Sequence, residues 1–180
     1  MTRRVLRHGM ALLLVAGVAF AAHAQRVPPD LSTRSDLGPS EPAFAAGGGA
    51  GSFAEVSQTG TDNQALLDQG GIGHTASITQ SGHGNWLQAT QSGSGHVLRA
   101  VQEGSGNQAL LSQSGTGNAI DLAQRGSANY AAIQQAGSAN RALVEQVGSG
   151  NRAEVTQLAT GGTATVRQNG SGNTAKIVQY

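Results

Sequence analysis

The sequence contains no cysteine among its 180 residues, which excludes disulfide frameworks and thiolate metal sites. Charged residues make up 12% of the chain and aromatic residues 3%, whereas glycine occurs 27 times. A globular enzyme of this length has more large side chains with which to fill its core. The composition therefore leaves two alternatives: a disordered chain, or a repetitive fold that packs small side chains.

Residues 1–24 have the pattern of a secretory signal peptide. Three arginines among the first seven residues precede an apolar segment over residues 11–22, and Ala22 and Ala24 form a small-x-small cleavage site. The apolar segment is too short to cross a bilayer comfortably. We therefore predict an exported chain that begins at Gln25.

Residues 25–51 show no period and read as a flexible leader, because prolines and glycines are frequent and large apolar residues are few. From Gln25 onward the chain has 8 basic and 10 acidic residues, a formal net charge of −2. A phosphate-binding surface needs clustered Lys and Arg, which this nearly neutral chain lacks. We therefore expect no nucleic-acid partner.

Residues 52–180 repeat with a period of 11, which indicates a repeat architecture. Glutamine recurs at every step: Gln58, Gln69, Gln80, Gln91, Gln102, Gln113, Gln124, Gln135, Gln146, Gln157, Gln168 and Gln179. Five residues after most of these stands an asparagine: Asn63, Asn85, Asn107, Asn118, Asn129, Asn140, Asn151 and Asn173. The residue two after the Asn position is mostly alanine, and the next but one is always apolar.

Within a unit, Asn63, Ala65, Leu67 and Gln69 lie two apart, so they share one face of a β-strand. The residues between them vary freely, as on an outward face. Because 11 is odd, a continuous strand would exchange its faces at every repeat. The x-Gly-x-Gly segment between Gln and Asn is where the chain can turn and restore them, so the pattern predicts a coil of alternating strands and turns.

Charge spacing distinguishes a coil of 11 residues from one of 22. At a spacing of 22 the sequence places opposite charges together at Arg99/Asp121, Glu103/Arg125, Glu145/Arg167 and Glu154/Lys176. At a spacing of 11 there is no opposite pair, and Arg141 would stack on Arg152. We therefore predict an all-β, amyloid-like β-solenoid of about six 22-residue coils with two strands per coil, about 29 Å tall at the spacing of hydrogen-bonded strands.

Inward Gln and Asn explain how such a coil could assemble further. A buried amide without partners costs roughly 2–7 kcal/mol, but stacked amides can donate to one rung and accept from the other. We interpret both columns as structural ladders. The two end rungs would then present unpaired amides and open strand edges to another copy.

No cofactor, metal or catalytic site is predicted. His74 and His96 occupy the Asn column two repeats apart, and we interpret them as polar substitutes for Asn, because no carboxylate column lies beside them. A calcium β-roll would need Asp in nearly every turn. The acidic residues are scattered and outward, so neither catalysis nor a small-molecule substrate is expected.

The columns resemble the curlin repeat of curli subunits, Ser-x5-Gln-x4-Asn-x5-Gln, which Ser52, Gln58, Asn63 and Gln69 match in full. The resemblance implies a subunit of an extracellular amyloid fibre (a fimbrium or pilus) on Gram-negative bacteria, serving adhesion and biofilm matrix. It implies as partners further copies, other curlin subunits, and an outer-membrane secretion pore with accessory chaperones.

Two details bear on the type of subunit. The unbroken step of 11 is similar to the minor, nucleating curlin subunit, whereas the ending at Gln179 and Tyr180 is similar to the major one. A monomeric secreted β-solenoid that binds ice or a glycan is the alternative function. Ice binding favours a flat column of threonine, but the column before Gln is mixed.

Overall fold

The computed structural model describes residues 51–180, which form twelve β-strands and no helix. Residues 1–50, including the predicted signal peptide and most of the predicted leader, lie outside the described part. The strands are β1 Phe53–Thr61, β2 Gln64–Ile72, β3 Thr75–His83, β4 Trp86–Ser94, β5 Val97–Ser105, β6 Gln108–Thr116, β7 Ala119–Ser127, β8 Tyr130–Ser138, β9 Arg141–Ser149, β10 Arg152–Gln157, β11 Thr163–Ser171 and β12 Thr174–Gln179.

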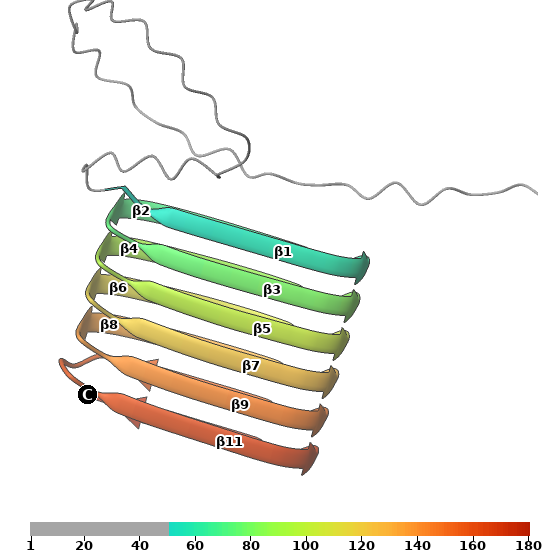
Figure 1. Ribbon diagram of the computed structural model, residues 1–180. Coiled ribbons are helices and arrows are strands. Elements are labelled where there is room, and N and C mark those ends of the chain that lie inside the picture. The colour runs from blue at the N-terminus through green and yellow to red at the C-terminus, as the bar shows by residue number, and fades with distance from the viewer. Residues whose placement is uncertain (1–50) are drawn as a thin grey trace, which may run out of the picture. The chain divides into compact units, whose positions relative to one another are not determined.

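The strands form two parallel six-stranded sheets. Odd-numbered strands make one sheet, in the order β1-β3-β5-β7-β9-β11, and even-numbered strands make the other, which we call the odd and even sheets. Paired residues are 22 apart throughout, as Gln102 and Gln124 are. The chain is therefore a β-solenoid of six rungs, each with one strand from each sheet (Figure 1). The predicted fold and the 22-residue coil are confirmed.

An alternation of burial along the inner strands, as far as the Gln of each, places the core between the two sheets. In β8 the residues Ala131, Ile133 and Gln135 are buried, while Tyr130 and Ala132 are only half-buried on the outer face. The core consists of the small Ala column and the larger apolar column of each strand. Because neighbouring rungs are in register, each column stacks on itself and excludes water along the length of the solenoid.

The corners differ from the expected x-Gly-x-Gly turn. Most strands continue past Gln through the first glycine, and the bend proper occupies only the two residues before the next strand. The first glycine has a φ between 103° and 119°, as Gly104 does (115°), and the second lies in the left-handed region, as Gly106 does (66°). Asp62, Ala128 and Ala139 occupy this second position with φ of 53–58°. The change of face is thus shared between two residues with positive φ.

Strand β10 is shorter than β9 and β11, the strands before and after it in the chain, because its corner lacks the first glycine. β10 ends at Gln157 after six residues, whereas β8 and β9 have nine. The next corner position is Ala159, whose Cβ disfavours the positive φ that glycine adopts at this place in the other corners. The ladder of strand hydrogen bonds therefore stops early at this corner.

Candidate functional site: amide ladders and open end rungs

The twelve Gln side chains form two continuous ladders, one in each sheet. Gln80 Nε2 donates to Gln102 Oε1 at 2.7 Å, and Gln102 Nε2 donates to Gln124 Oε1 at 2.8 Å. The odd-sheet ladder contains Gln58, Gln80, Gln102, Gln124, Gln146 and Gln168, and the even-sheet ladder contains Gln69, Gln91, Gln113, Gln135, Gln157 and Gln179.

Most of these amides also donate across the coil, which sequence reasoning missed. Gln102 Nε2 donates to the main-chain O of Trp86, 16 residues earlier on the opposite sheet, at 3.1 Å. Since one N–H follows the ladder and the other crosses the coil, both amide hydrogens of Gln102 are used. The crossing bond also fixes which amide atom is nitrogen, because a carbonyl oxygen there can only accept.

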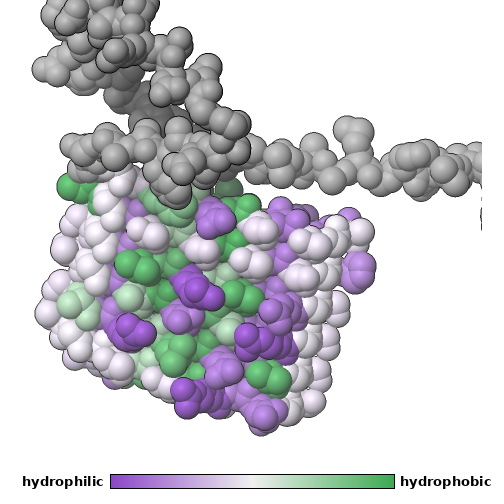
Figure 2. Space-filling model, viewed as in Figure 1, coloured by the Kyte–Doolittle hydropathy of each residue, from purple (hydrophilic) through white to green (hydrophobic). Residues whose placement is uncertain are grey.

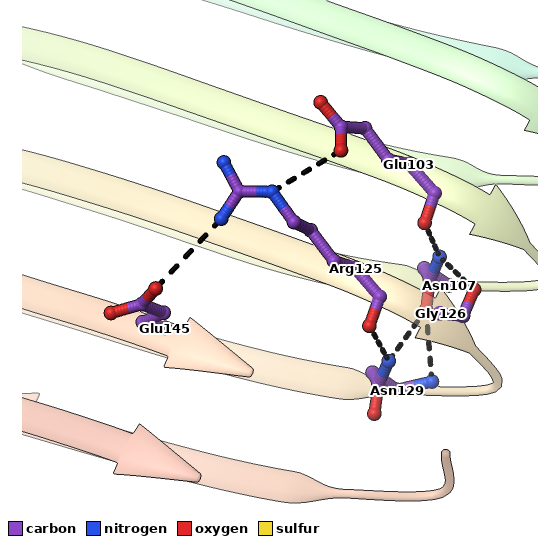
Figure 3. Close-up of polar contacts among 6 residues, drawn as sticks. All are labelled: Glu103, Asn107, Arg125, Gly126, Asn129 and Glu145. Atoms are coloured by element: carbon purple, nitrogen blue, oxygen red, sulfur yellow. Dashed lines mark hydrogen bonds and ion pairs between the residues drawn. The ribbon is translucent and has the colours of Figure 1, made fainter. Parts of the chain in front are cut away.

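Asparagine forms a second type of ladder at one corner, through Asn63, Asn85, Asn107, Asn129, Asn151 and Asn173. Asn107 Oδ1 accepts both the side-chain Nδ2 (3.0 Å) and the main-chain N (3.1 Å) of Asn129. Asn107 Nδ2 also donates to the main-chain O of Gly126 at 3.1 Å (Figure 3). These bonds hold the corner of each rung to the next.

The opposite corner is mixed and contains, in order, Ser52, His74, His96, Asn118, Asn140 and Gly162. The rings of His74 and His96 stack with centroids 5.0 Å apart and planes 6° apart. His96 Nε2 lies 3.0 Å from the main-chain O of Ser92 and its Nδ1 accepts from Asn118 N at 3.1 Å. His74 Nδ1 likewise accepts from His96 N at 3.2 Å, so each histidine replaces Asn as an acceptor for the next rung. Burial is the largest cause of the lowered pKa of His96, and the neighbouring His74 lowers it further.

The ladders satisfy every buried polar side chain of the described residues. Amides from Gln80 to Gln157 in both Gln columns are at most 1% exposed. Without partners each would cost several kcal/mol of folding free energy. The geometry therefore removes this cost for inner rungs by means of the rungs on either side.

Among residues 51–180, the first and last rungs have a neighbouring rung on one side only. In β1 the inward residue Val56 is 47% exposed, whereas Ile78, its partner in β3, is 0% exposed. At the other end Ile177 of β12 is only partly buried. Six of the nine large apolar residues that are exposed lie in the first and last rungs: Phe53, Val56, Leu66, Ile72, Val178 and Tyr180. Apolar surface is thus concentrated where the strand edges are open.

Ion pairs link neighbouring rungs on the outer faces. Three of the four charge pairs expected at 22-residue spacing are in contact: Glu103–Arg125 at 3.2 Å, Glu145–Arg167 at 3.7 Å and Glu154–Lys176 at 3.9 Å. Arg99 and Asp121 are in register, but no ion pair joins them in the described structure. On the odd-sheet face, hydrophilic and hydrophobic residues are intermixed (Figure 2).

Two further ion pairs were not expected from the sequence. Arg125 reaches Glu145 diagonally at 3.8 Å (Figure 3), and Arg152 contacts Glu154 on its own strand at 2.5 Å. The Arg152 guanidinium also lies 4.3 Å from the centre of the Tyr130 ring. The diagonal pair has a sequence spacing of 20, which a comparison of the spacings 11 and 22 does not detect.

Little else on the surface has the features of a reactive site. Within residues 51–180 no three His, Asp or Glu side chains converge on a point where a metal could bind. A shallow groove of about 330 Å³ crosses the even sheet above Ala132, between Leu110 and Glu154. It contains one carboxylate and no partner base. The described part of the chain has no helix long and apolar enough to cross a membrane.

Comparison with known protein families assigns the repeats to one family. The curlin associated repeat matches at residues 49–82, 98–126, 115–146 and 126–158, which together cover more than half of the chain. The chain belongs to the curlin associated repeat family. Curlin repeats and their β-solenoid are structural rather than enzymatic. No curated protein and no solved structure matches the chain significantly.

The matched segments coincide with the ladders. Each 11-residue unit contributes one Gln to a Gln ladder and one residue to a corner column, so two successive units build one rung. Each matched segment spans about three such units. Two segments of the solenoid, 83–97 and 159–180, are not matched. Segment 83–97 retains the same strand pairing as its neighbours. It contains His96 where other repeats have Asn.

Proposed function

We propose that this chain is a curli-type fibre subunit that assembles by stacking its end rungs on other curlin solenoids. The observation that carries the proposal is the unfinished state of both ends: the ladders and strands of the sheets stop at open edges with partly exposed apolar columns. Open parallel edges are templates for further strands. Adding a rung gives the terminal amides the same partners that inner amides have.

The wider role rests on the family. We propose export through the periplasm and an outer-membrane pore with accessory chaperones, followed by assembly into a surface fibre that serves adhesion and biofilm matrix. We also propose that the chain is closer to a nucleating than to a major subunit, because its repeats follow one another without a linker. The strands of a preformed solenoid end are already aligned. An incoming subunit that adds to this end therefore avoids the unfavourable first step of aligning strands.

Seeding tests this function. Purified chain, allowed to assemble, is sonicated and added at a few per cent to a soluble curlin subunit from the same organism. We expect the lag before thioflavin-T fluorescence rises to shorten or disappear. Seeds of an unrelated amyloid serve as the control and should leave the lag unchanged.

The same samples distinguish the alternative. If the chain stays monomeric for days by light scattering and leaves the lag unchanged, it is a solitary binding module and the fibre proposal is wrong. Binding of ice or of glycans by that monomer would then support the alternative.

A further inference from the structure

Charge is distributed unevenly along the axis of the solenoid. The first rung carries Glu55, Asp62 and Asp68 and no basic residue, whereas the last rung carries Arg167 and Lys176 and no acidic side chain. Each of the four rungs between them has equal numbers of acidic and basic residues, or none. The two ends are therefore opposite in charge, although the described part of the chain is nearly neutral.

A line of ion pairs runs down the odd sheet and stops at the last rung. It alternates between a straight step, from Glu103 to its register partner Arg125, and a diagonal step, from Arg125 to Glu145 (Figure 3). The next step is again straight, because Glu145 is in register with Arg167 and lies 3.7 Å from it. The line thus ends on an arginine whose next diagonal partner would lie one rung further along.

A second copy placed in register beneath the first supplies that partner. If β1 of the next copy continues the odd sheet at the same spacing, Thr165 faces Glu55 and Arg167 faces Ser57 of that copy. Glu55 then stands diagonally to Arg167, as Glu145 stands to Arg125, which faces Val147. The diagonal step is reproduced across the junction between copies.

The amide ladders have a direction that agrees with this arrangement. Gln amides donate toward the C-terminal rung, so Gln168 and Gln179 end the two ladders with donors, while Gln58 and Gln69 begin them with acceptors. In the Asn ladder each Oδ1 accepts from the next rung toward the C-terminus. Asn173 therefore ends that ladder with an acceptor on the C-terminal side. If two copies met through identical ends, amide donors would face donors and like charges would face each other.

Building on the fibre function, we propose that copies of this chain add head to tail in this register only, with an intersubunit ion pair between Arg167 and Glu55 of the next copy. Through this pair, the opposite charges of the two end rungs determine which end of a second copy can bind. It selects the C-terminal rung of one copy and the N-terminal rung of another, and it disfavours the two reversed arrangements.

Charge-reversed variants test the pair in trans. Glu55→Arg alone places two arginines at the junction, and Arg167→Glu alone places two glutamates there. We expect each variant to elongate on its own seeds about two- to five-fold more slowly than wild type at low salt, the range expected of an exposed pair. An equimolar mixture should recover most of the lost rate, because alternating copies restore the pair at every junction. The Glu145–Arg167 contact inside each Arg167→Glu copy stays lost, because both residues belong to one chain. In about 1 M salt the differences should vanish.

A pair within one chain provides the matched control. Glu103→Arg and Arg125→Glu disrupt a contact that mixing cannot restore, because both residues belong to the same solenoid. Recovery confined to the 55/167 mixture supports the proposal. Fibres that form from wild type, with no recovery on mixing or no defect in the single variants, would overturn the proposed register. Failure of wild type to form any fibre would instead refute the fibre function itself.

Discussion

An inward residue of the solenoid is surrounded by its own column and by the opposite sheet, so its tolerance of substitution is set by that environment. Ile133 is 2% exposed and stacks between Leu111 and Val155, whereas Ala132 beside it faces outward. One step along the chain thus separates a dry apolar column from a solvated surface.

This contrast gives the first prediction. Ile133→Lys should abolish fibre formation, because an uncompensated buried ammonium destabilises the fold by about 3–5 kcal/mol. Ala132→Lys should assemble at nearly the wild-type rate. Circular dichroism and thioflavin-T fluorescence measure both outcomes. Equal damage from the two variants would mean that the inner face has been assigned wrongly.

The stacked histidines give a prediction about pH. His96 is fully buried, its Nδ1 accepts a main-chain hydrogen bond, and burial lowers its pKa. Above the ordinary histidine pKa the ring is neutral in both the folded and the unfolded chain. As pH falls, the unfolded chain takes up a proton first, so stability is lost as pH falls through the lowered pKa. The slope is at most about 1.4 kcal/mol per pH unit.

We therefore expect the folded chain to melt at a lower temperature at pH 5 than at pH 7.5. His96→Asn, which supplies the residue found at the equivalent corner in other repeats, should reduce this difference. His83 lies at a corner on the surface, so His83→Asn is the control and should leave the pH dependence as it is. If the His96 variant kept the wild-type pH dependence, buried His96 would not be its cause.

At the scale of the strand and corner, the sequence predicted which residues point inward but not how the chain turns. Alternation at a period of two is visible in the letters, and the charges revealed the 22-residue register. The φ values of the two corner residues are not encoded in a spacing, and the strands are longer than the interval from Asn to the next Gln suggested. Crossing bonds such as Gln102 to Trp86 depend on the distance between the sheets, which no periodicity supplies.

Two glycines of one corner should respond differently to a methyl group. A Cβ on Gly104 would lie 2.0 Å from the main-chain O of Gly126, whereas a Cβ on Gly106 has no atom within 4 Å. Gly104→Ala should therefore prevent the rungs from closing. Gly106→Ala should lower the free energy of unfolding by only about 1 kcal/mol, the cost of a left-handed backbone conformation for a residue with a Cβ. Ala128 and Ala139 already adopt that conformation at the same corner position.

Thermal melts and assembly rates of the two glycine variants would show the difference. Similar behaviour of the two would mean that the rungs are not stacked as closely at the first glycine as the structure has them. The short strand β10 is consistent with the same steric limit, since Ala159 stands there in the position of Gly104.

At the scale of the whole molecule, six rungs with opposite ends form a unit that can be repeated along one axis. The ladders are complete in the middle and incomplete at the two ends, so stability and assembly depend on the same bonds. The inward Gln and Asn columns of the sequence predicted that the end rungs would present unpaired amides. The segregation of charge to the end rungs becomes visible only when each residue is assigned to a rung, because a spacing between charges within the chain does not compare its two ends.

The most direct test of the central claim is the axial repeat of the fibre, measured by helical reconstruction from cryo-electron micrographs. Stacked solenoids predict one subunit for every six rungs, about 29 Å along the axis, with strands perpendicular to the axis and about 4.8 Å apart. A repeat of one subunit per layer of about 4.8 Å would show that each chain lies flat in an ordinary cross-β stack, and it would contradict assembly through the end rungs.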